Sequence, residues 1–181
     1  MTTSRRPRAA LRIVGWLAVL GAAAGAVWAF LAPPVRMLVV AEDRGVVLTT
    51  ESLHSFDAIA IFAGIGLVLG VLSAVAVWGM RRSRGPAALA ALVVGSGVGA
   101  GVAALVGMGV ARLRFPDVES PAVGDIVAAA PGLVTPTVLI LQPLAAALIY
   151  LLLVSLSPDD DLGISDHKPA AEPAPDVAVE R

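Results

Sequence analysis

The chain has 181 residues, of which 57% are hydrophobic and only 15% are charged, and its formal net charge is −1. A soluble domain carries about 25% charged residues, so this composition indicates a chain that lies largely in lipid. The near-neutral charge and the lack of basic patches argue against nucleic-acid binding. The absence of cysteine excludes disulfides, thiolate metal sites and cysteine nucleophiles.

The first apolar run, residues 11–32, has about 22 residues, which is enough to cross roughly 30 Å of hydrocarbon. It follows residues 1–10, a basic segment without acids that is predicted to be cytoplasmic. A cleaved secretory signal is the alternative, but Phe30-Leu31-Ala32 provides no A-x-A-like cleavage site, so the sequence favours an uncleaved anchor. Trp16 and Trp28 are expected near the two ends of this span, at the membrane interfaces.

Residues 33–56 form the first predicted outer loop. Pro33-Pro34 ends the preceding helix, because proline lacks the amide proton that a helix needs. β-Branched residues are frequent on both sides of a turn at Glu42–Gly45, which indicates a small β-hairpin. Two strands alone are marginal in water, so the hairpin should lean on the helices or on the lipid surface.

Two further spans are predicted over residues 57–80 and 86–110. Asp57 stands in the first turn of the second span, where a carboxylate suits the helix dipole. The second outer loop, residues 111–133, contains a stretch at 122–130 with apolar residues on one side. This stretch is predicted to be a short helix along the membrane surface.

The fourth span is predicted over residues 134–156. Pro143 lies inside it and should kink the helix and free the carbonyl group of Leu139. We expect the Gln142 amide to cap that carbonyl, or one left exposed beside a glycine. The tail, residues 157–181, has three consecutive aspartates and four prolines with few large apolar residues, so it is expected to be a disordered cytoplasmic tail.

Small residues recur at intervals of four in the first three spans. In water each such glycine would destabilise a helix by roughly 1 kcal/mol, whereas in hydrocarbon the helix holds and neighbouring backbones can approach closely. No G-x-G-x-x-G pattern with a strand-turn-helix frame is found, which argues against nucleotide binding. Helix packing is therefore predicted at Gly21, Gly25, Gly66, Gly70, Gly95, Gly97, Gly99, Gly101 and Gln142.

The basic residues predict the orientation. Four spans place both termini on one side of the membrane. Eight basic residues lie near the membrane on that side and four on the other. By the positive-inside rule, both termini are expected in the cytoplasm of a bacterium, with the protein in the plasma membrane.

The ionisable residues grouped on the outer side are Glu51, His54, Asp57, Arg112 and Arg114. The first three recur every three residues, which brings them near one another if the second helix begins early. Such a group could bind a divalent cation or shuttle a proton. The favoured interpretation is a solvated helix start whose acids complement the dipole and pair with the arginines, so no metal and no other cofactor is predicted.

The second and third spans carry a resemblance to a known family. Its residues are the segment Glu51–Ala58, Trp78, and the turn Arg81–Gly85 ahead of a glycine-rich span. They resemble an uncharacterised actinobacterial family of four-span membrane proteins, domain of unknown function 2567, over roughly residues 10–157. The resemblance implies a four-span fold and an inner-membrane location. It carries over no catalytic residue and suggests Glu51 and Asp57 as the acids to test first.

These patterns predict an all-α membrane protein, a bundle of four transmembrane helices with a small extracytoplasmic β-hairpin. The interior of the spans contains no Asp, Glu, Lys, Arg or His, which argues against an ion-coupled transporter. The favoured role is a non-enzymatic accessory or scaffold subunit of the cell envelope that contacts membrane lipids and binds a membrane protein or itself. The alternative is a small transporter or channel for a lipid or apolar solute, and an enzyme using the outer acids ranks third.

Overall fold

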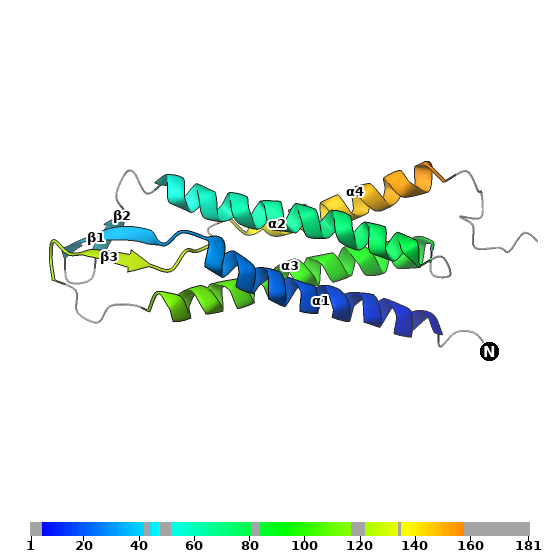
Figure 1. The fold of residues 1–181 in the computed structure, drawn as a ribbon, viewed down its shortest axis with the longest axis horizontal. Coiled ribbons are helices and arrows are strands. Elements are labelled where there is room, and N and C mark those ends of the chain that lie inside the picture. Colours follow the sequence, from blue (N-terminus) through cyan, green and yellow to red (C-terminus); the bar gives the residue numbers. More distant parts are fainter. Residues whose placement is uncertain are drawn as a thin grey trace, which may run out of the picture.

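The computed structural model describes residues 5–41, 44–47, 52–80, 84–116, 122–133 and 135–157. Four long helices lie side by side, and a small sheet extends beyond one end of them (Figure 1). We call this end of the molecule the sheet end. The helical elements are α1 (Arg5–Leu31), α2 (Ser52–Gly79), α3 (Pro86–Arg114) and α4 (Leu141–Ser155), the last preceded by the short 3₁₀ helix η3 (Pro136–Ile140).

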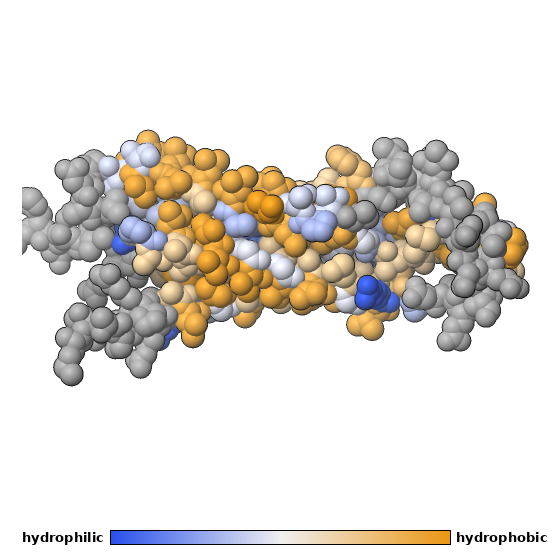
Figure 2. Space-filling view, turned by 180° about the vertical axis from the view of Figure 1, so that it is seen from behind, coloured by the Kyte–Doolittle hydropathy of each residue, from blue (hydrophilic) through white to orange (hydrophobic). Residues whose placement is uncertain are grey.

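Each of the four predicted spans is present as a helix long and apolar enough to cross a membrane. The candidate spans are Ala10–Leu31, Phe56–Gly79, Pro86–Arg114 and Pro136–Ser155. Their mean hydropathy lies between 2.0 and 2.5. Apolar side chains cover most of the visible middle of the molecule (Figure 2), as expected for a surface that meets lipid rather than water. The predicted all-α membrane fold is confirmed, and the four spans point to a multi-pass membrane protein.

The sheet contains one strand more than predicted. The expected hairpin is formed by β1 (Val35–Ala41) and β2 (Arg44–Val47), and β3 (Ile126–Ala129) pairs antiparallel with the other edge of β1. The prediction of a surface helix at 122–130 is therefore wrong. Gly124 has a φ of 100° and opens a turn, and the free edge of β1 then offers the following β-branched residues a ladder of hydrogen bonds.

The closest helix contact joins α1 to α3. A Cβ atom added at Gly25 would lie 2.8 Å from the carbonyl carbon of Ala103, and one added at Gly21 would lie 2.8 Å from that of Gly99. The two backbones therefore touch, and no side chain larger than hydrogen fits between them. Helices that associate in lipid gain van der Waals contact in this way, because burial in lipid itself supplies no hydrophobic driving force.

A second pair of helices is formed by α2 and α4. A Cβ atom added at Gly70 would lie 2.6 Å from the carbonyl oxygen of Gln142 and 2.9 Å from the Cβ of Ala145. Contact between α3 and α4 joins the two pairs, while the contacts of α2 with α1 and α3 are sparser. The molecule is thus two tightly packed helix pairs that meet along α3 and α4.

Trp28 lies near the end of α1, as predicted, but its side chain packs inside the helical core instead of on the outer surface, where an interfacial aromatic residue was expected. Its side chain is fully buried, its Nε1 donates a hydrogen bond to the carbonyl oxygen of Ala58 at 2.7 Å, and its ring meets Phe62 edge to face. Gly107 makes room for the indole, because a Cβ there would lie 2.7 Å from the ring atom Cε3. Trp16, in contrast, is 69% exposed on the outside of α1.

The predicted kink inside a continuous helix over 134–156 is replaced by a change of helix type. Residues Pro136–Ile140 form a 3₁₀ helix, and the α-helix begins at Leu141. Pro143 therefore lies in the first turn of α4, where a missing amide proton breaks no helical hydrogen bond. Two prolines seven residues apart thus mark the starts of η3 and α4.

Candidate functional site

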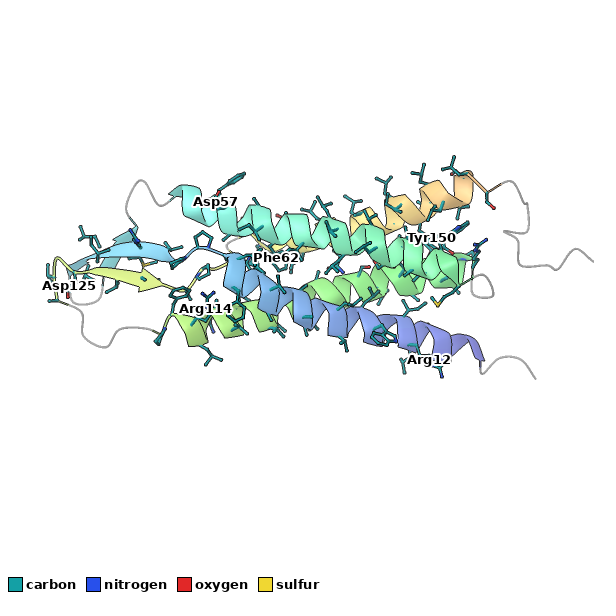
Figure 3. All side chains as sticks on the ribbon, in the orientation of Figure 1. Arg12, Asp57, Phe62, Arg114, Asp125 and Tyr150 are labelled. Atoms are coloured by element: carbon teal, nitrogen blue, oxygen red, sulfur yellow. The ribbon has the colours of Figure 1, made fainter. Side chains whose placement is uncertain are left out.

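The described members of the predicted outer cluster of ionisable residues lie toward the sheet end. Glu51 lies outside the described residues, and His54 belongs to the first turn of α2. Asp57 is exposed on α2, and Figure 3 shows that Asp57 and Arg114 both lie toward the sheet end of the molecule, on different helices. Among the residues that the structure describes, no three potential metal ligands come together.

Arg114 contacts the end of α1. Its Nη1 donates a hydrogen bond to the carbonyl oxygen of Ala29, and its guanidinium lies 4.7 Å from the ring centroid of Phe30 and 5.2 Å from that of Phe115. Ala29 is among the last four residues of α1, whose carbonyl groups have no partner within the helix. Arg114 therefore caps the C-terminal end of α1. Arg112, two positions earlier on α3, is exposed.

At the opposite end, the link between α2 and α3 is tied to α4. The hydroxyl group of Tyr150 accepts a hydrogen bond from the Gly85 amide at 3.1 Å and is placed to donate one to the Gly85 carbonyl at 3.4 Å. Arg84 stacks 4.2 Å from the centre of the Trp78 ring, which meets Tyr150 edge to face. Sequence reasoning missed this cluster. The sequence features that could have pointed to it are the single tyrosine of the chain and the Gly85-Pro86 start of the third helix.

Gln142 lies where the two helix pairs meet. Its side chain is only 3% exposed, its Cβ would lie 3.6 Å from a Cβ added at Gly66, and its Nε2 would lie 3.4 Å from one added at Gly99. Beside it is a cavity of about 10 Å³ that residues of all four helices line, including Ala24, Gly66 and Ala103. The expected cap is not seen, because the amide makes no hydrogen bond to any described residue.

The glycines of α3 divide between two faces. Gly95, Gly99 and Gly107 lie against α1, within 3 Å of its atoms if a Cβ is added. No described atom lies within 4 Å of a Cβ added at Gly97 or Gly101, so the packing expected at these two positions is not seen among the described residues. The reason is geometric: positions two apart on an α-helix point about 200° apart, so both ladders cannot face α1.

Comparison with known proteins gives relatives without an assigned function. Uncharacterized protein ML1222 of Mycobacterium leprae is 32% identical over 176 residues, which cover 87% of this chain and 89% of that protein. Uncharacterized protein Rv1591 of Mycobacterium tuberculosis is 30% identical over 183 residues, 91% of this chain and 93% of the relative. No solved structure matches. The family model described as "Protein of unknown function (DUF2567)" matches residues 17–164, and the chain belongs to this family.

Proposed function

We propose that this protein is a non-enzymatic accessory or scaffold subunit of the bacterial cell envelope. It binds a transmembrane helix, from a larger membrane protein or from a second copy of this chain, through the outward face of α3. The observation that supports this proposal is the position of Gly97 and Gly101, which are four residues apart on α3 with nothing of the described chain against them.

The chemistry of this face suits another helix. Val94, Val98 and Leu105 are exposed around the two glycines. Because the glycines have no side chains, we expect a shallow groove between these apolar residues. A neighbouring helix can place its backbone close to such a groove and gain van der Waals contact that lipid chains supply less well. The inner glycines of α3 are already used against α1 and are not available to a partner.

The transporter alternative has less support. The outward face of α3 could hold an acyl chain, but transport across the membrane also needs a passage between the helices, and the cavity beside Gln142 has a volume of about 10 Å³. That volume suits a single water molecule. We therefore favour binding of a helix over passage of a solute.

Leucine at Gly97 or Gly101 should abolish assembly, because its side chain fills the groove. Gly64→Leu is the matched control, since Gly64 is exposed on α2 and also has nothing within 4 Å of an added Cβ. The measurement is in-cell photo-crosslinking followed by co-purification in mild detergent, with a captured second copy and a captured larger protein distinguished by mass. Equal capture by all three variants, or no captured protein with the unmodified chain, would rule out this face as an interface.

We further propose a plasma-membrane location with both termini in the cytoplasm, which puts the sheet outside. The support is the positive-inside rule applied to the basic residues near the ends of the spans. Since the chain has no cysteine, single cysteines can report topology. Val123→Cys, at the exposed tip of the sheet end, should react with an impermeant maleimide in intact cells. Ser83→Cys should react only after permeabilisation, and the reverse pattern would invert the proposed orientation.

A further inference from the structure

Two polar side chains in the helical core lack hydrogen-bond partners among the described residues. Ser96 is fully buried on α3 and its Oγ has none. Gln142 is 3% exposed, and its carboxamide also has no hydrogen-bond partner among the described residues. Serine on a helix can bond to a carbonyl of the preceding turn after a small rotation, but a carboxamide has two donors and an acceptor to satisfy. Gln142 therefore has more unsatisfied hydrogen-bonding groups than Ser96.

The cavity beside Gln142 has room for a hydrogen-bonding partner of this carboxamide. Its volume of about 10 Å³ is close to the minimum that holds one water molecule. Gln142 is the only polar side chain among the described residues that line it, the others being aliphatic, aromatic or glycine. An ion would have no charged or multiple ligands there, and an acyl chain would not fit.

We infer that this cavity binds one structural water molecule, held by the carboxamide of Gln142. A water can accept a hydrogen bond from the N–H that lies cis to the carbonyl group and donate one to the carbonyl oxygen of the same amide. Gly66, which has no side chain, leaves the main chain of α2 open to a further hydrogen bond. The water then bridges Gln142 of α4 and the main chain of α2, while Ala24 and Ala103 of the α1–α3 pair enclose it through apolar contacts.

The chain offers a direct test, because Gln142 is its only glutamine and it has no asparagine. Protein labelled with ¹⁵N and embedded in lipid nanodiscs should therefore show a single side-chain carboxamide NH₂ pair. The rotating-frame Overhauser spectrum of this pair should contain a cross-peak at the water frequency, with the sign that distinguishes proximity from proton exchange. If this pair shows cross-peaks only to aliphatic and aromatic protons, the cavity is dry and the inference is wrong.

Two alanine variants locate the water. A Cβ at Gly66 would meet Gln142 only at ordinary contact distances of 3.6 and 3.9 Å, so Gly66→Ala should fold and fill part of the cavity. The water cross-peak should then fall to background. Gly64→Ala, two residues away with nothing within 4 Å of the added Cβ, should leave it unchanged. Persistence of the cross-peak in Gly66→Ala would place the detected water elsewhere and overturn the assignment.

Discussion

Gly25→Ala should lower the free energy of unfolding by about 3 kcal/mol, the upper part of the range for overpacking a close contact. The added Cβ would lie 2.8 Å from the carbonyl carbon of Ala103 and 2.9 Å from its Cα. Both atoms belong to the backbone of α3, which cannot turn aside as a flexible side chain does. The helices must therefore separate, and the van der Waals contact along this part of α1 is lost.

The matched control for Gly25→Ala is Gly15→Ala on the same helix, where nothing lies within 4 Å of the added Cβ. Alanine has the higher helix propensity, so this variant should be neutral or slightly stabilising. Unfolding can be followed by titration with a denaturing detergent, with tryptophan fluorescence as the signal. Equal stability of the two variants would show that α1 and α3 do not meet at Gly25.

Trp28→Ala should lower the free energy of unfolding by about 3–5 kcal/mol, the usual range for truncating a fully buried large aromatic side chain. The indole fills the space between α1, α2 and α3: its N–H bonds to Ala58, its ring packs edge to face on Phe62, and Gly107 accommodates it. Alanine would leave a cavity that these three helices cannot close without moving. The loss should appear as a lower unfolding midpoint.

Two further variants separate the contributions of Trp28. Trp28→Phe keeps most of the apolar volume but removes the donor to Ala58, so its loss should be about 1–2 kcal/mol. Trp16→Ala removes an indole that is 69% exposed and should change stability by less than about 1 kcal/mol. If the Trp16 and Trp28 variants unfold alike, the indole of Trp28 is not a core side chain.

The spans and the hairpin were predictable because their causes are local. A run of about 20 apolar residues can satisfy its backbone groups in lipid only as a helix. The hairpin follows from β-branched residues on both sides of a turn that is near in sequence. The third strand was missed because Ile126–Ala129 pairs with β1, about 90 residues earlier in the chain, and short apolar segments have no strong periodicity of their own.

The candidate site was predicted less completely. The pattern singled out Gln142 and the glycines as places where helices meet, and the structure brings Gly21, Gly25, Gly70 and Gly99 into such contacts. The sequence alone did not separate Gly99 from Gly97, since both continue four-residue ladders. It also offered no sign that Arg114 caps α1 or that Tyr150 holds Gly85, because each contact joins residues at least 65 positions apart.

Composition and local patterning by themselves determined that four helices are apolar enough to span a membrane, and where each begins and ends to within a few residues. Which face of each helix turns inward was decided only by tertiary packing. A helix with small residues all round has several nearly equivalent faces, and the choice depends on the shapes of its neighbours. That choice buries Gly99 and Trp28, leaves Gly97 and Gly101 open, and encloses the Gln142 amide beside its cavity.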